Sequence, residues 1–353
     1  MTTHLLAPRR EASAPSVPAS TAGSRPRLRL RGVDALRGLA VVGMLFVDNR
    51  GNASIAAQLK HEAWNGLHLA DVVFPVFLLV VGVSMPFSRR AERPRPALTR
   101  VVKLAVLGWL IVTAKYGFGT VGAGVLGHIA GAYLLCWLLL RLPRPAQVPV
   151  AAGVLAALSV LTVAGNADPD RSWGHSFDAA LGLPFSAEAP HGYLASAVTV
   201  FLGVLAGRAL QAGAGRPALV RLTAGGAALL VTGLALAPLV PVNKRMWSPS
   251  FVLVTGGIAL LALALLHWLV DGRGLVGPLR AFEVLGLNAI VAFVVSEVVF
   301  RAVLSHSVQP AVDGWVTSLA GATVSAWLYP VLSVGVIWAV CAALVRRGII
   351  VRV

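Results

Sequence analysis

The sequence predicts an all-α fold, a polytopic integral membrane helical bundle of about ten transmembrane helices with both chain ends in the cytoplasm. Three observations support this prediction. First, 57% of the 353 residues are hydrophobic and only 12% are charged, whereas a soluble domain is roughly half apolar and about a quarter charged. Second, basic residues gather in alternate connections between the apolar runs. Third, runs without Asp, Glu, Lys or Arg reach the roughly 20 residues that span a bilayer; they are 146–167, 222–243, 246–270 and 315–345.

The apolar runs predict helices rather than strands. An open sheet in lipid would leave backbone N–H and C=O groups unpaired, and barrel strands alternate in polarity. The last uncharged run contains Pro330 and is longer than one span, so it holds either a kinked helix or a helix preceded by a re-entrant piece around 315–322. The predicted spans are 33–49, 69–88, 101–117, 121–140, 146–165, 193–211, 219–240, 250–270, 281–300 and 323–345.

The domain organisation follows from a change in composition near residue 31. Residues 1–31 are rich in Ala, Pro, Ser and Arg and have few large apolar residues, a composition typical of disorder. We expect a disordered basic cytoplasmic tail over 1–31 and one transmembrane domain over 32–353. Anionic lipid would attract the arginines that end the tail. The first ten residues are not followed by an apolar segment, so we expect no cleaved signal peptide.

The distribution of charge predicts orientation. Lys and Arg are about threefold more numerous in the connections assigned to the cytoplasm than in the opposite ones, as the positive-inside rule requires. The formal charge of +16 therefore indicates membrane orientation rather than nucleic-acid binding. We expect a multi-pass protein of the cell (inner) membrane, with the lipid bilayer as partner and no nucleic acid. Cys136 and Cys341 lie in apolar segments and form no disulfide framework or metal motif, so we expect no metal.

Polar residues at membrane depth mark candidate sites, because a charge there costs roughly 2.5–3.5 kcal/mol on insertion scales. Most of them gather around the first two predicted helices. His61 is the best candidate base, since an imidazole titrates near neutral pH and can accept a proton from a nucleophile. We expect Asp48 or Asp71 to fix its tautomer, and Asn49 and Asn65 to donate to a developing oxyanion. The alternative is that His61 is a solvated loop residue and Asp71 a helix cap.

The segment LKHEAWNG, residues 59–66, is expected to form a short interfacial helix. In a helix, His61 and Asn65 would be four residues apart and share one face. Trp64 would lie at the headgroup level, either touching substrate or anchoring the chain in the membrane.

Two further groups of polar residues could serve a ligand or the fold. Asn243 and Lys244 precede Trp247, and they either hold an anionic or hydroxylated ligand or cap a helix end. Asp34 and Arg37 lie at the inner end of the first predicted helix, where we expect them to pair.

Residues 33–84 carry a resemblance to a known family. VDALRGLAVVGMLFVDNRG is followed by LKHEAWNGLHLADVVFPVFLLVVGVS, and the combination of HxxWNG, ADxVFP and FLxxVGVS is specific. The chain resembles the heparan-α-glucosaminide N-acetyltransferase family of transmembrane acyltransferases, including its bacterial members. Weaker matches keep their order at 124–133, 201–208, 241–253 and 285–290.

The resemblance implies an enzyme that moves an acetyl (acyl) group from cytosolic acetyl-CoA, or another acyl-CoA, to an amine or hydroxyl acceptor at the extracytoplasmic side. In the family the histidine of HxxWNG is catalytic, so the resemblance assigns His61 as general base or transient acyl carrier. The donor's carbonyl must then reach the outer half through a channel among the first, second, fourth and ninth predicted helices. The other expected site residues are Asp71, Asn65, Asp48 and Asn49 for catalysis, Arg37, His128 and Asn288 for the donor, and Trp64, Asn243, Lys244 and Trp247 for the acceptor.

One departure from the family pattern affects the donor. The family commonly has GVLQR where this chain has GVLGH, so Gly127 and His128 replace Gln and Arg; donor binding is altered if that Arg contacts the donor. A histidine alone in an apolar helix is otherwise a structural residue.

The expected acceptor is a small molecule or an amino-sugar-like saccharide, and relatives make a homodimer reasonable. The alternatives to an enzyme are a secondary transporter and a catalytically silent ligand-binding membrane protein.

Overall fold

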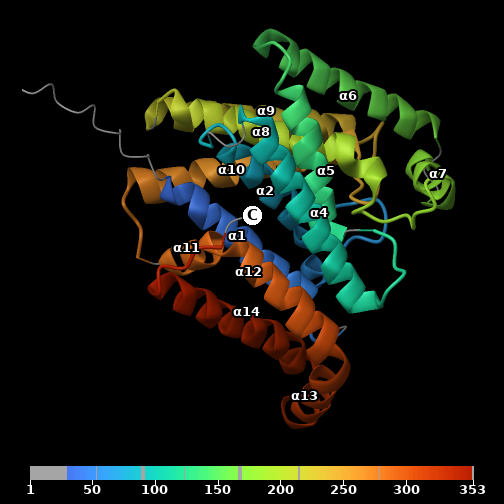
Figure 1. Cartoon of the computed structure of the whole chain (residues 1–353), viewed down its shortest axis with the longest axis vertical. Helices are drawn as coiled ribbons and strands as arrows, with labels where there is room; N and C mark the ends of the chain where they lie inside the picture. Colours follow the sequence, from blue (N-terminus) through green and yellow to red (C-terminus); the bar gives the residue numbers. More distant parts are fainter. Residues whose placement is uncertain are drawn as a thin grey trace, which may run out of the picture.

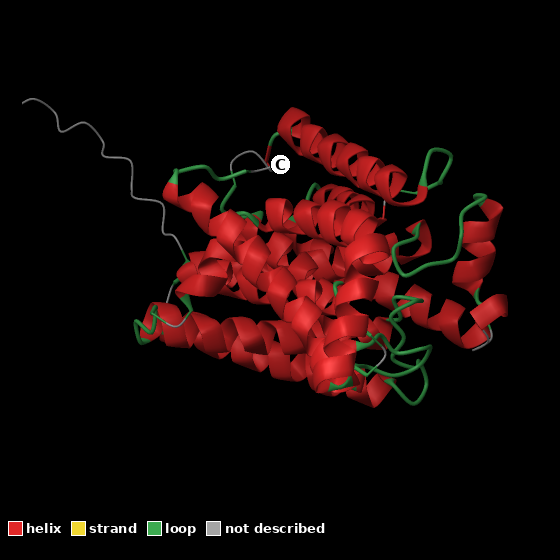
Figure 2. Cartoon of the chain, turned by 90° about the horizontal axis from the view of Figure 1, so that it is seen from below, coloured by secondary structure: helices red, strands yellow, loops and turns green. Residues whose placement is uncertain are grey.

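The computed structural model describes residues 30–52, 54–88, 92–122, 124–165, 169–213, 215–277 and 279–351. All regular secondary structure in these ranges is helical, and they contain no strand (Figure 2). The predicted all-α class is therefore confirmed for the described chain. The tail predicted over 1–31 lies outside the described residues except for its last two positions, so its disorder stays a prediction.

The helices form a bundle in which α1 lies near the centre and α11 to α14 cover one side (Figure 1). Short 3₁₀ turns at Ala57–Leu59, Pro169–Arg171 and Pro190–Gly192 join some of them, and π-helical stretches at His267–Gly272 and Val295–Leu304 extend α10 and α12. The α-helices are α1 (Arg31–Asp48), α2 (Leu69–Ser84), α4 (Pro94–Tyr116), α5 (Gly124–Leu139), α6 (Arg144–Ala164), α7 (Trp173–Ala180), α8 (Tyr193–Gln211), α9 (Arg216–Leu236), α10 (Pro249–Leu266), α11 (Arg280–Leu287), α12 (Ala289–Val294), α13 (Ser305–Ala320) and α14 (Ala322–Arg346).

Seven helical stretches among the described residues are long and apolar enough to cross a membrane. They comprise α4, α6, α8, α9, α10 with its π-helical extension, the stretch from α12 to α13, and α14. Two more helices, α2 and α5, are apolar but have only 16 residues each. The chain is a multi-pass membrane protein. The predicted count of about ten crossings and the cytoplasmic position of both ends stay predictions.

The predicted span 281–300 is wrong as a single helix. α11 ends at Leu287, and Asn288 leaves the helical conformation with φ −118° and ψ 38°. The Asn288 amide donates to the Ile349 carbonyl at 3.2 Å, and its oxygen accepts from the Val351 N–H at 2.9 Å. The break is therefore held by the C-terminal segment, 61 residues away in the chain from Asn288, a contact that local hydrophobicity does not reveal.

The chain beyond this break is more helical than predicted. The sequence predicted no span between 300 and 323 and allowed a re-entrant piece around 315–322, but α13 and the π-helical stretch before it occupy most of this region. This region is as polar in sequence as a loop would be, because its polar side chains make contacts at the end of α1. Gln309, for example, donates to the carbonyls of Arg50 and Gly51 at 3.0 and 2.8 Å.

The interfacial helix predicted over 59–66 is also wrong. After a short 3₁₀ turn the chain is extended and bent. Backbone groups that a helix would pair internally are bound elsewhere. Gly66 N–H donates to the Val242 carbonyl at 2.8 Å, and Glu62 N–H donates to the Asp71 carboxylate at 3.1 Å. Tertiary hydrogen bonds thus replace the local helix.

α1 lies inside the bundle, as the sequence predicted, and packs against α2 and α11 (Figure 1). Glycine permits the close approach to α11: a Cβ at Gly38 would collide with the backbone of Phe282, and a Cβ at Gly286 with the Asp34 carbonyl. Small residues allow such contact between helices in a membrane, where burial of apolar surface gives little drive for association. The predicted ion pair at the start of α1 forms, with Arg37 Nη1 3.0 Å from Asp34 Oδ1.

Candidate active site

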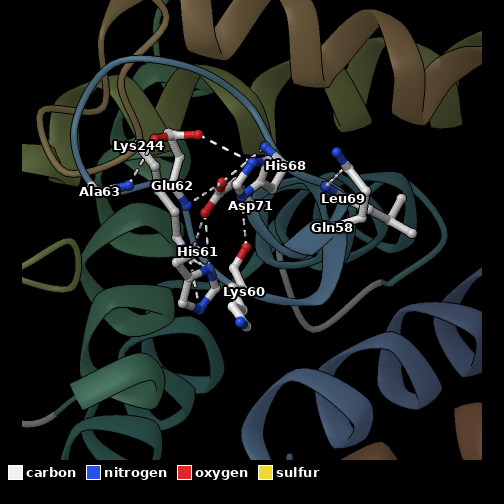
Figure 3. A network of polar contacts seen from close by, with 9 residues as sticks. All are labelled: Gln58, Lys60, His61, Glu62, Ala63, His68, Leu69, Asp71 and Lys244. Atoms are coloured by element: carbon white, nitrogen blue, oxygen red, sulfur yellow. Dashed lines mark hydrogen bonds and ion pairs between the residues drawn. The ribbon is translucent and has the colours of Figure 1, made fainter. Parts of the chain in front are cut away.

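Asp71, in the first turn of α2, organises the segment that precedes it (Figure 3). Its side chain is fully buried. One oxygen, Oδ2, accepts hydrogen bonds from the backbone N–H groups of Glu62 and His68, each at 3.1 Å. The other oxygen, Oδ1, lies 2.8 Å from His61 Nδ1. A carboxylate in the first helical turn also faces the positive end of the helix dipole, so Asp71 is both a helix cap and the partner of His61.

The contact with Asp71 favours a proton on His61 Nδ1. An ionised carboxylate only accepts hydrogen bonds, so the Nδ1–H donates to Asp71, and the Nε2 lone pair is the one that can accept a proton. Lys244 Nζ lies 3.0 Å from His61 Nδ1, 3.4 Å from His61 Nε2 and 3.6 Å from Asp71 Oδ1. The His61 side chain is 43% exposed, which leaves it reachable by a ligand. Imidazole, carboxylate and ammonium groups therefore meet at one point.

Lys244 comes from the connection between α9 and α10, which is tied to the segment that carries His61. Asn243 Nδ2 donates to Asn65 Oδ1 at 2.9 Å. Within the connection, Asn243 Oδ1 accepts from Met246 N–H at 2.9 Å, and Asn243 N–H donates to Ser248 Oγ at 3.0 Å. The Asn243 amide and the Asn65 carbonyl oxygen thus join the two loops.

A buried histidine that the sequence prediction missed also supports this connection. His191 Nδ1 lies 2.6 Å from Asp178 Oδ2, and its Nε2 lies 2.7 Å from the Arg245 carbonyl. Both partners accept hydrogen bonds, so the ring donates from both nitrogens and forms an ion pair with Asp178. The pair holds the backbone next to Lys244. Its members lie far from Lys244 in the sequence, and no motif marks them.

Burial and nearby carboxylates have opposite effects on the pKa of Lys244. Burial lowers the pKa of Lys244 below the ordinary value of a lysine, and the nearby carboxylates of Glu188, Asp71 and Asp48 partly oppose this effect. The ammonium side chain is only 12% exposed. Because water screens this place little, the field of Lys244 in its ammonium form acts strongly on a neighbouring ligand.

A pocket begins at these residues and extends between four helices. Its lining comes from α1, α2, α5 and α12, with His61, Glu188 and Lys244 from the loops. These helices correspond to the four predicted spans among which the sequence predicted a channel. Ala40 and Phe77 line its deep part, eight residues from Asp48 along α1 and six from Asp71 along α2. At 1.5 Å per residue the pocket reaches roughly 10 Å into the bundle. No group of three or more His, Cys, Asp or Glu side chains in the described ranges could hold a metal.

The two predicted catalytic residues at the end of α1 form their ion pair and hydrogen bonds with residues other than His61. Asp48 lines the pocket, but its carboxylate pairs with Arg301 at 3.4 Å. Of the two carboxylates that could orient His61, Asp71 is the one in hydrogen-bond contact. The Asn49 amide nitrogen donates to the Leu45 carbonyl and to Ser296 Oγ, at 3.1 and 2.8 Å, so it is not aimed at His61.

The residues predicted to contact the donor lie elsewhere. Arg37 is paired near the start of α1, and Asn288 holds the C-terminal segment. His128 is fully buried in α5 and stacks on Trp247 with ring centroids 5.0 Å apart. Trp247 in turn donates its indole N–H to the Ala187 carbonyl at 2.6 Å. In the described part of the chain, neither these three predicted donor contacts nor Trp247, which was predicted for the acceptor, lines the pocket.

Comparison with known proteins agrees with the motifs around His61. A family model described as heparan-alpha-glucosaminide N-acetyltransferase, catalytic, matches residues 29–216, which is more than half of the chain. The chain belongs to this family. Human heparan-alpha-glucosaminide N-acetyltransferase is 27% identical, in an alignment that covers 76% of this chain and 53% of the human protein. The mouse protein of the same name is 37% identical over 100 residues, 26% of this chain and 15% of the mouse protein.

The heparan-alpha-glucosaminide N-acetyltransferase family was the one that the motifs indicated, so that resemblance is confirmed. The matched range contains both His61 and Asp71, whereas Lys244 and the α12 wall of the pocket lie beyond residue 216. The chain spans about half the length of the human relative.

Proposed function

We propose that this chain is a membrane acyltransferase that moves an acetyl group from acetyl-CoA, or another acyl group from its CoA thioester, to an amine or hydroxyl acceptor. One observation carries the proposal. His61 Nδ1 contacts the buried Asp71, which favours the tautomer with its lone pair on Nε2, and the ring lies at the mouth of a pocket between four helices.

The chemical step follows from that tautomer. The acceptor amine attacks the thioester carbonyl carbon, the new C–N bond forms, and Nε2 of His61 takes the amine proton. The carbon–sulfur bond then breaks, the electron pair leaves on sulfur, and the sulfur takes the proton back from His61 Nε2, so CoA departs as the thiol and the neutral imidazole is restored. Asp71 stabilises the imidazolium that forms and keeps the ring oriented. A hydroxyl acceptor follows the same course with a C–O bond. A route through acyl-His61 is the variant, and release of CoA before acceptor is added distinguishes it.

Lys244 is the group that stabilises negative charge on the carbonyl oxygen in this proposal. Its ammonium lies beside His61, lines the same pocket and is poorly exposed. Preorganised cations and donors at such a position act on the charge that develops in the transition state. Of the amides expected for this role, Asn49 donates to Leu45 and Ser296, and neither Asn49 nor Asn65 lines this pocket.

The pocket suits the acyl end of the donor. Its deep part is lined by apolar side chains, among them Ala40, Met44, Val73, Phe77 and Ile129. We place the His61 end at the extracytoplasmic surface of the cell membrane, as the charge distribution predicts, so the thioester approaches through the bundle from the cytoplasmic side. The homodimer that the resemblance implies stays a prediction.

Transport is the rival function, because broken helices such as α11–α12 often mark substrate sites of secondary transporters. Here the amide at the break, Asn288, is occupied by Ile349 and Val351. The break is thus filled by the chain itself, which favours the acyltransferase.

The test is transfer by purified protein in detergent, with radiolabelled acetyl-CoA and a panel of amino sugars. The wild-type chain should form labelled acetyl-amino sugar, and His61→Ala should lower kcat by roughly 10²–10⁴-fold. His175→Ala is the matched control, since His175 lies in α7 and does not line this pocket. Full activity in His61→Ala would falsify the mechanism, and vesicle uptake without transfer would favour the transporter.

A further inference from the structure

Trp247 has a backbone conformation that bulky residues avoid. It lies three residues after Lys244 in the connection between α9 and α10, and its φ is 47°. Among the described residues it is the one non-glycine residue with a positive φ. A bulky side chain makes this left-handed conformation unfavourable, so it persists only where the surrounding contacts hold it. The contacts of Trp247 therefore show what this conformation serves.

Three rings enclose the Trp247 side chain, which is fully buried. His128 stacks on the indole, with ring centroids 5.0 Å apart and 23° between the ring planes. Phe74 and Phe251 meet the indole edge to face at 5.7 and 5.4 Å. The hydrogen bond from the indole N–H to the Ala187 carbonyl fixes the rotation of the ring. Stacking, edge contacts and this bond together hold one position of the side chain.

His128 gives the indole a fixed, flat surface. It is fully buried in α5, whose residues Val125 and Ile129 line the pocket. Phe74 and Tyr193 meet the imidazole edge to face, with ring centroids 5.4 and 5.0 Å apart. The imidazole is thus held by the wall of the pocket, and the indole that stacks on it takes its position from that wall.

The backbone of Trp247 closes the turn that carries Lys244. Trp247 N–H donates to the Lys244 carbonyl at 3.1 Å, and Ser248 N–H donates to the Asn243 carbonyl at 3.1 Å. Because these bonds join the two ends of one short turn, a change in φ at Trp247 moves the Lys244 backbone. Lys244 Nζ lies 3.6 Å from Asp71 Oδ1, so its place beside that carboxylate depends on this turn.

We propose that Trp247, stacked on His128, is the residue that positions Lys244 beside His61. The inference rests on the acyltransferase function proposed above and adds how the cation of that site is held. Trp247 and His128 do not line the pocket, so they act through Lys244 and touch neither substrate.

Loss of this stacking has a consequence for the charge of Lys244. Burial lowers the pKa of Lys244, and a loosened turn lets water reach the ammonium. Its pKa should then rise toward the ordinary value of about 10.4. The groups around it that can carry charge are Asp48 of α1, Asp71 of α2, and Glu188 and His61 of the loops.

A direct measurement of the Lys244 pKa tests the positioning role without catalysis. The purified full-length chain is methylated reductively over a range of pH, and peptide mass spectrometry follows Lys244, with the exposed Lys103 as reference. His128→Leu fills the space without a ring, so the pKa of Lys244 should rise toward that of Lys103. His128→Phe keeps a ring against the indole and should preserve the wild-type pKa.

Transfer kinetics give a second readout. His128→Leu should lower kcat roughly tenfold or more, because the cation is misplaced in the transition state. The KM for acetyl-CoA should change by less than about twofold, since the pocket keeps its lining. His128→Phe should restore kcat. A residue that merely stabilises the fold would not produce this split between kcat and KM.

A second variant disturbs the same contact from another side. A Cβ at Gly192 would lie 2.5 Å from Trp247 Cδ1 and 3.1 Å from His128 Cε1. Gly192→Ala should therefore displace the indole and also raise the pKa of Lys244. Phe201→Ala is the matched control: Phe201 is a 1% exposed aromatic residue that does not line the pocket. It should unfold at a lower temperature than the wild type but keep the wild-type pKa of Lys244.

Two results would overturn the positioning role. One is an unchanged pKa of Lys244 in both His128→Leu and Gly192→Ala; thermal unfolding identifies a variant that does not fold, and the other variant then decides. The second is an equal rise of that pKa in Phe201→Ala. The proposed function fails separately, because methylation involves no transfer. If the pKa rises as expected while His61→Ala keeps full transfer, the positioning of Lys244 stands and the catalytic role of His61 falls.

Discussion

His61 Nδ1 lies 2.8 Å from Oδ1 of Asp71, and the other oxygen of that carboxylate holds two backbone N–H groups in the same segment. One buried side chain therefore fixes the position of the loop, the start of α2 and the orientation of the imidazole. This relationship gives the first prediction.

Asp71→Asn should impair the carboxylate's action on the His61 ring while it preserves the fold. The amide oxygen can still accept the two backbone N–H groups, but an amide cannot stabilise an imidazolium as a carboxylate does. We expect kcat to fall roughly 10²-fold or more with little change in thermal unfolding. Asp71→Ala should also leave the backbone donors unpaired and cost about 1–3 kcal/mol of stability for each buried group. Transfer kinetics and unfolding in detergent measure both effects. Equal kcat in Asp71→Asn and wild type would contradict the orienting role.

Lys244 should set the alkaline limit of activity. Burial lowers its pKa, so the ammonium loses its proton at a lower pH than an ordinary lysine, whose pKa is about 10.4. Because the ammonium is the form that stabilises the oxyanion, kcat/KM should fall as pH rises through this lowered pKa. Lys244→Arg should move that limb to higher pH, and Lys244→Met should lower kcat roughly 10²-fold. A pH–rate profile measures both, and an unchanged alkaline limb in Lys244→Arg would argue against the assignment.

Loss of the buried pair of His191 and Asp178 should lower the free energy of unfolding more than it lowers the rate of transfer. Neither side chain is exposed, and removal of one partner leaves an uncompensated buried group. Asp178→Ala should therefore cost about 3–5 kcal/mol. Thermal unfolding in detergent measures the loss, with Asp170→Ala at an exposed position as the control. A small loss in Asp178→Ala, similar to that of the control, would contradict the ion pair.

Phe77 should limit the length of the acyl group. It lines the deep part of the pocket, so Phe77→Ala should open space and raise the rate with butyryl-CoA relative to acetyl-CoA. Phe87→Ala is the control, because Phe87 is also partly buried but does not line the pocket. The ratio of kcat/KM for the two donors is the measurement. The same ratio in both variants would place the acyl group elsewhere.

Membrane orientation can be tested by labelling of single cysteines. Cys136 and Cys341 are buried, so their background reaction should be low. A cysteine introduced at the exposed Ala63, beside His61, should react with an impermeant maleimide added to intact cells. A cysteine at the exposed Arg347, after α14, should react only after the membrane is opened. The reverse pattern would overturn the predicted cytoplasmic C-terminus and the extracytoplasmic site.

The sequence alone determined the class of the protein and the membership of its family. Apolar runs determine helices because lipid cannot hydrogen-bond to an exposed backbone, so every predicted span except 281–300 coincides with helix. Contiguous motifs likewise marked His61 and Asp71, since the residues lie in one short segment. Even the pair of Asp34 and Arg37 followed from spacing along one helix.

Only the tertiary structure decided how the site is assembled, because its contacts join residues that are distant in the chain. Lys244 reaches His61 across 183 residues, and the Asn288 break is held by a segment 61 residues away. The loop around His61 stayed extended because Val242 and Asp71 supplied the hydrogen bonds that a local helix would have made. Local sequence encodes hydrophobicity and backbone preference, whereas the choice of a distant hydrogen-bond partner depends on the packed position of the helices.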